Sequence, residues 1–213
     1  VLLLDEPLSA LDAKLRTHMR LELKNLQKRL GITFIFVTHD QEEALSMSDR
    51  IAVMNKGKVE QIGTAAEIYH HPHTEFVASF IGETSIVEAE VLEHQDGLIL
   101  CRLEGGLQLW IKEAEGARPG SKMLVSVRPE KVRLFRDRPA AGQNVFSGQV
   151  SREVFKGAVD DMTIVTEGGL ELSALLANAG ETGLDFHEGE QVWCLIHPND
   201  INLLVKEGYG IAG

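Results

Sequence analysis

The sequence predicts an α/β part over residues 1–82, followed by an all-β part over residues 83–213. Three observations carry this prediction. In the first part, continuous apolar runs alternate with stretches in which apolar residues recur every three or four positions, as in strands that alternate with amphipathic helices. In the second part, glycines separate short apolar runs of the kind that form strands. The second part also repeats itself internally, which indicates two related β units.

A strand, a helix and a second strand are predicted at the start. Val1–Leu4 is a continuous apolar run, as expected of a strand buried on both faces of a parallel sheet. A helix follows that ends at Gly31, and Thr33–Val37 forms the second strand. The buried side of the helix is expected to comprise Leu11, Leu15, Met19, Leu23, Leu26 and Leu30, and its solvated side Lys14, Arg16, Arg20, Lys24, Lys28 and Arg29.

Two further helices are predicted to begin with a capping box. In this motif two residues three positions apart each accept, through the side chain, a hydrogen bond from the backbone N–H of the other. Asp40 with Glu43 predicts the start of a helix that reaches about Met47. Thr64 with Glu67 predicts the start of another. The order strand, helix, strand, helix indicates a βαβ unit with parallel strands.

A hairpin and a short helix complete the first part. Residues 51–54 and 59–62 flank a turn at 55–58 whose glycine suits a positive φ. A short helix starts at Thr74, and Gly82 is expected to end both this helix and the first domain.

The second part contains two copies of one pattern. Residues 104–109 match residues 167–172, and residues 123–134 parallel residues 192–203. In each copy a glycine closely precedes the second matching segment. Two related β units indicate two small barrels or one split barrel, closed so that few strand edges remain exposed.

Composition excludes several classes of protein. The 213 residues include 21 Lys and Arg, 32 Asp and Glu, and two Cys. The net charge of −11 argues against binding nucleic acid through phosphate neutralisation, and −9 of it lies in residues 82–213. Two cysteines far apart in the chain do not indicate a disulfide framework or a zinc site. No apolar run approaches the roughly 18 residues of a membrane-spanning helix.

Chemically capable side chains follow both predicted strands. Asp5 and Glu6 come directly after the first strand, Ser9–Asp12 come next, and His39 follows the second strand. Ligands of open α/β sheets bind at this edge. One carboxylate can hold Mg²⁺ through water, and the next can orient a water that attacks a phosphoryl group. Each element alone could merely end a strand or cap a helix, but their order and spacing together indicate phosphoryl chemistry.

On these residues the first part resembles the C-terminal portion of the P-loop ATPase domain of an ABC transporter. Leu2–Glu6 resembles the Walker B strand with the catalytic Glu that follows it, and Ser9–Asp12 resembles the D-loop. His39 resembles the switch histidine. Residues 68–80 resemble a junction found in binding-protein-dependent importers of sugars, polyamines, ferric iron and sulfate, with the polyamine (spermidine/putrescine) type as the preferred subgroup.

The second part resembles the regulatory domain of the same importers, the OB-like TOBE domain. The resemblance covers residues 83–206, and Val127–Glu130 is its most recognisable piece. The predicted organisation is therefore an incomplete ATPase domain over residues 1–82 and a TOBE domain over residues 83–213.

The resemblance implies a role for each site residue. Asp5 would hold Mg²⁺ through water, Glu6 would act as general base or orient the water, and His39 would contact the γ-phosphate. Ser9 and Asp12 would reach the nucleotide across a head-to-tail homodimer of ATPase subunits. The implied cofactors are ATP and Mg²⁺. The other implied partners are transmembrane permease subunits and, indirectly, a periplasmic or lipoprotein substrate-binding protein. The implied location of this protein is the cytoplasmic face of the inner or plasma membrane. No nucleic-acid partner is implied.

The nucleotide site that the resemblance implies is only half present. The sequence contains neither Gly-x-x-x-x-Gly-Lys-[Ser/Thr] nor Leu-Ser-Gly-Gly-Gln, both of which lie before Walker B in the family. The chain also opens abruptly on an apolar run, so we expect a piece of a longer ATPase. We predict that this chain alone neither hydrolyses ATP nor binds it tightly, and that its first part rearranges or is completed by swapping with a second chain.

Three functions follow from this sequence. The leading one is the energy-coupling, ATP-hydrolysing subunit of a bacterial importer. The alternative is a non-enzymatic module that regulates, dimerises or binds a small anion. The third, a DNA-repair or translation ATPase of the same superfamily, is disfavoured by the importer-type β domain and its net charge of −9.

Other features are interpreted as structural. Cys101 and Cys194 lie in strand-like runs and are expected to be buried thiols. Arg128–Glu130 is expected to form a turn rather than an anion site. The three histidines around Pro72 are expected to lie in a solvated loop rather than to bind metal.

Overall fold

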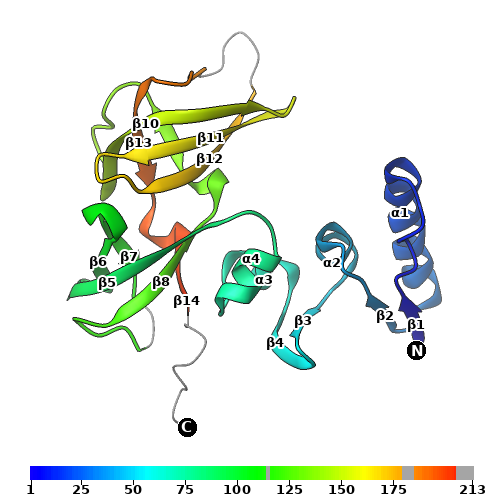
Figure 1. Ribbon diagram of the computed structural model, residues 1–213. Coiled ribbons are helices and arrows are strands. Elements are labelled where there is room, and N and C mark those ends of the chain that lie inside the picture. Colours follow the sequence, from blue (N-terminus) through cyan, green and yellow to red (C-terminus); the bar gives the residue numbers. More distant parts are fainter. Residues whose placement is uncertain (114–115, 179–184, 205–213) are drawn as a thin grey trace. The chain divides into compact units, whose positions relative to one another are not determined.

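The structure, a computed structural model, describes residues 1–113, 116–178 and 185–204 (Figure 1). Residues 205–213 of the predicted second domain, together with 114–115 and 179–184, lie outside the described residues. The chain divides into two compact units. The first unit comprises residues 1–71 and 80–82, and the second comprises residues 72–79 and 83–213.

The first unit contains a parallel strand pair, a hairpin and three helices. β1 and β2 pair in parallel, with Leu3 opposite Ile35 and Asp5 opposite Val37, as the predicted βαβ order requires. In chain order the elements are β1 (Leu2–Asp5), α1 (Ala13–Leu30), β2 (Phe34–Val37), α2 (Gln41–Met47), β3 (Ile51–Asn55), β4 (Lys58–Gly63) and α3 (Ala65–His70).

The predicted C-terminal end of α1 and the predicted capping box of α3 are confirmed. The Asp12 carboxylate caps α1 by accepting a hydrogen bond from the Leu15 backbone N–H, and Gly31 ends α1 in the left-handed conformation. Thr64 and Glu67 form the complete capping box at the start of α3. The β3–β4 hairpin turns at Lys56 and Gly57, both with positive φ, as the glycine in its turn predicted.

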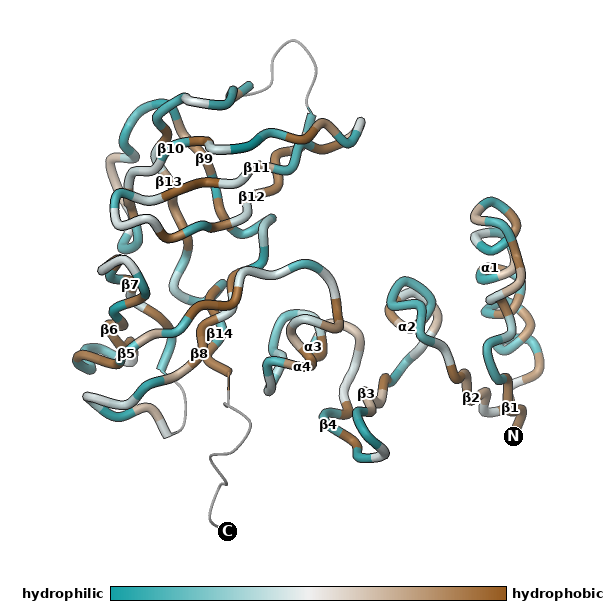
Figure 2. The backbone as a smooth tube through the Cα atoms, in the orientation of Figure 1, coloured by the Kyte–Doolittle hydropathy of each residue, from teal (hydrophilic) through white to brown (hydrophobic). Residues whose placement is uncertain are grey.

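The prediction that the first strand is buried on both faces is wrong. One face of the β1–β2 pair carries Leu3, Ile35 and Val37, whose exposed fractions are 70%, 48% and 55%. Figure 2 shows both strands as hydrophobic segments. The physical reason is that β1 and β2 make a two-stranded sheet on their own, so no neighbouring strand of the described chain extends it. The apolar run at residues 1–4 therefore predicted the strand correctly but predicted its burial wrongly.

The second unit consists of two five-stranded sheets. Before them, α4 (Glu75–Phe80) gives its first five residues to the second unit and Phe80 to the first. The remaining elements are β5 (Ser85–Gln95), β6 (Leu98–Leu103), η1 (Glu104–Gly106), β7 (Gln108–Lys112), β8 (Lys122–Val127), η2 (Pro129–Lys131), β9 (Arg133–Phe135), β10 (Asn144–Phe155), β11 (Val159–Thr166), β12 (Glu171–Ala177), β13 (Gln191–Ile196), η4 (Pro198–Asp200) and β14 (Ile201–Leu204).

The two sheets exchange their last strands. One sheet has the order β14-β8-β5-β6-β7, and the other has the order β12-β11-β10-β13-β9. The strand β9 belongs to the first copy of the repeat but pairs with β13 of the second copy, through Leu134 opposite Cys194. The strand β14 belongs to the second copy but pairs with β8 of the first, through Ile201 opposite Val127. In Figure 1 β14 lies beside β8.

The predicted repeat is confirmed at the level of individual hydrogen bonds. The Leu103 N–H donates to the Leu107 carbonyl at 2.8 Å, and in the second copy Thr166 donates to Leu170 at 2.9 Å. Strands β5 and β10 carry a register shift at the same place in each copy. Beside each shift a glycine with positive φ, Gly120 or Gly189, donates its N–H to the facing strand.

Equivalent residues of the two copies also meet each other. The backbones of Gly105 and Gly168 approach so closely that a Cβ on Gly168 would lie 1.7 Å from the Gly105 carbonyl oxygen. The side chains of Lys131 and Asp200, at matching positions in η2 and η4, form an ion pair at 2.9 Å. Contacts between matching residues indicate a pseudo-twofold axis that relates the copies and passes between these pairs.

One hydrophobic core runs through both sheets and contains both thiols. Residues from β5–β8 and from β10–β13 belong to the same buried cluster, which includes Cys101 and Cys194. Burial raises the pKa of Cys101 to about 11 and that of Cys194 to about 12, so both stay protonated at neutral pH. The prediction of buried thiols is confirmed.

Arg128 has a structural position, as the turn interpretation expected. Its side chain is buried, and its guanidinium donates to the carbonyl oxygens of Ala78 at 3.2 Å and Glu83 at 3.0 Å. The adjacent Pro129 opens the short helix η2. The guanidinium thus satisfies backbone acceptors that lead into β5.

Among the described helices, none combines the length and the apolar character needed to cross a membrane.

Replacing Gly168 with alanine should destabilise the second unit by about 3 kcal/mol, because the new Cβ must displace the Gly105 backbone. The matched control is Gly97→Ala, where φ is +76° but no atom lies within 4 Å of the new Cβ, so only the backbone conformation costs about 1 kcal/mol. Both tryptophans, Trp110 and Trp193, lie in this unit, so urea unfolding followed by tryptophan fluorescence measures it. Equal losses in the two variants would contradict the close approach.

Candidate functional site

The structure brings together the carboxylates and the histidine that the sequence singled out. Asp5 ends β1, Glu6 follows it, and His39 follows β2 by two residues. Because β1 and β2 are parallel, their C-terminal ends meet at one edge of the pair. Glu6 Oε1 lies 3.0 Å from His39 Nδ1, and both side chains are exposed, His39 by 74%.

The backbone holds Glu6 in an uncommon conformation. Its φ is +44°, in the left-handed region that non-glycine residues rarely adopt. Its N–H donates to the Val37 carbonyl at 2.8 Å, which continues the β1–β2 ladder by one residue. Backbone strain of this kind, of order 1 kcal/mol or more, is found where surrounding structure fixes a side chain for a task. Here it directs the Glu6 carboxylate toward His39.

Ser9 and Asp12 make local contacts on the loop between β1 and α1. Ser9 Oγ donates to the Glu6 carbonyl at 3.0 Å, and the Asp12 carboxylate caps α1. Both side chains are exposed, whereas Leu8, which precedes Ser9, is buried and anchors the loop. Ser9 therefore lies within one turn of Glu6, while Asp12 sits at the helix start.

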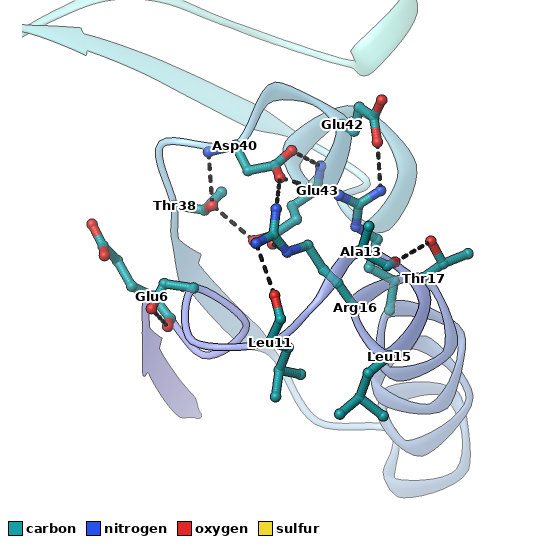
Figure 3. Close-up of polar contacts among 12 residues, drawn as sticks. Glu6, Leu11, Ala13, Leu15, Arg16, Thr17, Thr38, Asp40, Glu42 and Glu43 are labelled. Carbon is teal, nitrogen blue, oxygen red and sulfur yellow. Dashed lines mark hydrogen bonds and ion pairs between the residues drawn. The ribbon is translucent and has the colours of Figure 1, made fainter.

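Arg16 of α1 connects this loop to the segment after β2. Its guanidinium donates to the Leu11 carbonyl at 3.1 Å and to Asp40 Oδ2 at 3.1 Å (Figure 3). Arg16 Nε also lies 3.9 Å from Glu43 Oε1. The residue beside His39 is thus tied, through one side chain, to the loop that begins with Glu6.

A second arginine reinforces the same contact between α1 and α2. Arg20 pairs with Asp40 at 3.2 Å and with Glu42 at 2.9 Å, and its side chain is only 14% exposed. Lys24, one turn further, donates to the Ser46 carbonyl at 2.7 Å. The expectation that Arg16, Arg20 and Lys24 lie on a solvated face is therefore wrong for these three residues. Carboxylates of Asp40 and Glu42 pair with the two guanidinium groups, and the Ser46 carbonyl accepts from Lys24.

The expected apolar face of α1 is also less buried than predicted. No residue of α1 is buried, and Leu15 and Leu30 are exposed. The helix therefore depends on its polar contacts with α2 more than its sequence periodicity indicated.

The capping arrangement at α2 differs from the predicted box in one bond. The Asp40 carboxylate accepts from the Glu43 N–H at 3.1 Å, as predicted. The Asp40 N–H, however, donates to Thr38 Oγ1 at 3.0 Å, and this hydroxyl donates to Glu43 Oε2 at 2.8 Å. The Thr38 hydroxyl is inserted into the box and fixes the backbone on both sides of His39.

These contacts lower the pKa of Asp40. Burial by itself would raise the pKa, but the backbone hydrogen bond from Glu43 and the charge of Arg20 outweigh it. The pKa of Arg20 is raised in turn, first by its hydrogen bond to Glu42, although burial opposes the shift. Asp40 and Arg20 are therefore both charged at neutral pH.

The geometry suits part of a magnesium-nucleotide site. Asp5 supplies an exposed carboxylate at a strand end, where Mg²⁺ is commonly held through water. Glu6 and His39 can together hold a water or a phosphate oxygen near that edge. A glycine-rich phosphate loop is absent from the sequence, so these residues do not by themselves cradle the β- and γ-phosphates.

Sequence reasoning missed Arg16 and Arg20 as part of this site. Their spacing of four residues places them on one face of α1, and α2 opens with acidic Asp40, Glu42 and Glu43. The complementary charge of the two helices was a usable signal. The strong apolar periodicity on the same helix concealed it.

Searches for related proteins find close relatives over most of the chain. It is 46% identical over 197 residues to the "Spermidine/putrescine import ATP-binding protein PotA" of Nitratidesulfovibrio vulgaris, which covers 90% of this chain and 53% of that protein. It is 45% identical over 209 residues to the protein of the same name from Roseobacter denitrificans, which covers 97% and 56%. This chain therefore spans about half the length of the curated relatives it matches.

The second unit also matches known domains. The family model of the TOBE domain matches residues 125–204. Among solved structures, the cytoplasmic molybdate-binding protein ModG superposes on 56% of this chain and 94% of its own, with a TM-score of 0.50 and 17% identity. At that identity the likeness concerns the fold, and it agrees with the predicted OB-like TOBE architecture.

Replacing Asp40 with asparagine should weaken the first unit by about 1–2 kcal/mol, because it keeps a capping oxygen but leaves Arg16 and Arg20 without their shared carboxylate. The lowered pKa gives the sign of the pH effect. The ionised Asp40 stabilises the fold above its ordinary pKa of 3.8, and this contribution is lost as pH falls through its lower folded-state pKa.

Amide hydrogen exchange of α1 and α2 measures this loss, because the tryptophans lie outside the first unit. The wild-type advantage should be full at pH 6 and should shrink below about pH 4. The exposed Asp49→Asn is the control and should change protection by less than about 0.5 kcal/mol. An advantage that persists unchanged in acid would exclude the ionised carboxylate as its source.

Proposed function

This chain is homologous, over about half of their length, to bacterial ATP-binding proteins for spermidine/putrescine import, and we propose that it carries the hydrolytic half of such a subunit's nucleotide site together with its regulatory domain. Residues 1–82 form the ATPase portion and residues 83–213 the TOBE portion in this proposal. One observation carries it. Asp5-Glu6, Ser9–Asp12 and His39 occur in the family's order, and the fold sets Glu6 3.0 Å from His39 at one sheet edge.

Each residue has a distinct task in the proposed reaction. When bound, ATP would supply the phosphoryl group and Mg²⁺ would neutralise its charge. Asp5 holds the ion through water at the end of β1. Glu6 accepts a hydrogen bond from the attacking water and orients it, and His39 keeps the Glu6 carboxylate in place and faces the terminal phosphate. Phosphoryl transfer depends mainly on such positioning.

The D-loop residues and the partners complete the proposal. Ser9 and Asp12 are exposed at the start of α1, where a second ATPase subunit can contact them. Polyamines are the proposed cargo, because the relatives are named for spermidine and putrescine import. Permease subunits and a substrate-binding protein are the proposed further partners, and the cytoplasmic face of the membrane is the proposed location.

This chain by itself should show no ATP hydrolysis and no tight ATP binding, because no phosphate loop precedes β1 in the sequence. Calorimetric titration with ATP and Mg²⁺ measures binding, and phosphate release measures turnover. Tight binding of one ATP per chain would contradict the expectation.

A hybrid protein tests the function. This chain replaces the matching span of the Nitratidesulfovibrio vulgaris relative, and the hybrid should hydrolyse ATP and restore spermidine uptake in cells that lack their own subunit. Glu6→Gln should reduce hydrolysis by roughly 100-fold or more while ATP binding remains, because only the water-orienting carboxylate is lost. Glu22→Gln, on the exposed side of α1, is the control and should leave hydrolysis unchanged.

The outcome separates the two functions that the sequence suggested. Hydrolysis that depends on Glu6 supports the energy-coupling subunit. A folded hybrid that binds ATP but does not hydrolyse it, or that hydrolyses it equally well after Glu6→Gln, would favour a non-enzymatic regulatory module instead.

A further inference from the structure

Three potential metal ligands converge on the second unit, which contains none of the nucleotide-site residues. Glu153, Asp185 and His187 each offer one ligand atom, and these atoms lie within 4.8 Å of one another. His187 Nδ1 lies 3.3 Å from Glu153 Oε2, and His187 Nε2 lies 3.4 Å from Asp185 Oδ2. Each separation is close to that between neighbouring ligands around a tetrahedral ion with bonds of about 2.0–2.2 Å, and the two involve different nitrogens of the ring, of which one binds the ion.

The segment that carries two of these ligands is anchored. Phe186 lies between Asp185 and His187 and is fully buried, so the two flanking side chains stay at the surface. The Arg136 guanidinium lies over the Phe186 ring at 5.4 Å and donates to the Asp185 carbonyl. Arg136 also pairs with Glu190 at 3.6 Å. Anchoring of this kind reduces the entropy that a bound ion must overcome to order its ligands.

The third ligand comes from a regular strand. Glu153 lies on β10, opposite Met162 of β11, just beyond the register shift of β10. The Glu153 side chain is 28% exposed and contacts the His187 ring, while the Glu153 backbone is held in the sheet. The set therefore combines an Asp-x-His pair on one segment with a glutamate from a neighbouring strand.

The internal repeat supplies a comparison within the molecule. The hydrogen bonds at the two register shifts match Glu153 to His94 of the first copy. The positions that match Asp185 and His187 are Gly116 and Arg118. Among the residues that the structure describes there, His94 pairs with one carboxylate, that of Glu113, at 3.1 Å. Within the described residues, three converging ligands thus occur in the second copy and not in the first.

We propose that Glu153, Asp185 and His187 bind one divalent transition-metal ion of the zinc class on the surface of the second unit. One imidazole and two carboxylates form a ligand set that suits Zn²⁺ or Co²⁺, with water at the remaining position. Mg²⁺ is disfavoured because it prefers oxygen ligands in octahedral geometry. The surrounding charge also favours a cation, since the second part carries a net charge of −9.

Glu153 faces Nδ1 of the imidazole and Asp185 faces Nε2, and one ligand atom of each residue lies within 4.8 Å of the other two. An ion bound at either ring nitrogen is therefore within reach of both carboxylates. The ion binds one ring nitrogen, and the other nitrogen remains free for one hydrogen bond.

Zinc titration of the complete chain tests the site. Calorimetry with ZnCl₂ at pH 7.5 should show one ion bound per chain, and Co²⁺ should give the visible absorption of a four- or five-coordinate complex. His187→Gln, which keeps a hydrogen-bonding side chain but offers no imidazole, should weaken Zn²⁺ binding by roughly 10-fold or more. His94→Gln, at the matching position of the first copy, is the control and should leave the affinity unchanged.

The remaining outcomes contradict the proposal. One is the absence of saturable Zn²⁺ binding by the wild-type chain. Another is binding that survives His187→Gln but disappears when the exposed histidines His70, His71 and His73 are replaced together.

Unchanged tryptophan-fluorescence unfolding of His187→Gln without metal shows that the variant is folded, so a loss of Zn²⁺ binding then reports the loss of the site. None of these results depends on ATP hydrolysis, so the test is independent of the proposed function.

Discussion

The reciprocal pairing of β9 with β13 and of β14 with β8 is the constraint on which the second unit depends. Each five-stranded sheet takes its last strand from the other copy of the repeat, so neither copy completes a sheet by itself. The buried Asn144 adds a further tie, because its side-chain amide bonds both the N–H and the carbonyl of Trp110 at 2.7 Å. Both copies contribute to one continuous core, so we expect them to unfold together rather than as independent barrels.

The first unit is held together by different forces. Its longest helix buries no residue completely, and its contact with α2 is made largely by ion pairs and hydrogen bonds around Asp40. These bonds are also the ones that fix the backbone beside His39 and connect it to the loop after Glu6. The same polar network thus holds α1 against α2 and positions the backbone beside His39. Such a network is more sensitive to the loss of one charge than an apolar contact is to the loss of one methylene.

The sequence predicted local features well because local chemistry determines them. The capping box at Thr64 and the stop at Gly31 follow from backbone groups within a few residues. The repeat was legible for the same reason, and so was the order of Asp5, Glu6 and His39. Strand exchange was not predictable, because matching strands β9 and β14 have the same pattern whichever copy they join. The exposure of Leu3 and the ion pairs of Arg16 were missed because burial depends on neighbours that are distant in the chain.

The exchanged strands also set an order for folding during synthesis. Val127 of β8 pairs with Ile201 of β14, and 74 positions separate them in the chain. At a translation rate of about 5–20 residues per second, the edge of β8 waits roughly 4–15 s for its partner. During that interval the edge presents unpaired backbone groups of a largely buried strand, which makes it the point most open to pairing with another nascent chain. The last strand to be made is therefore the one that closes the first sheet.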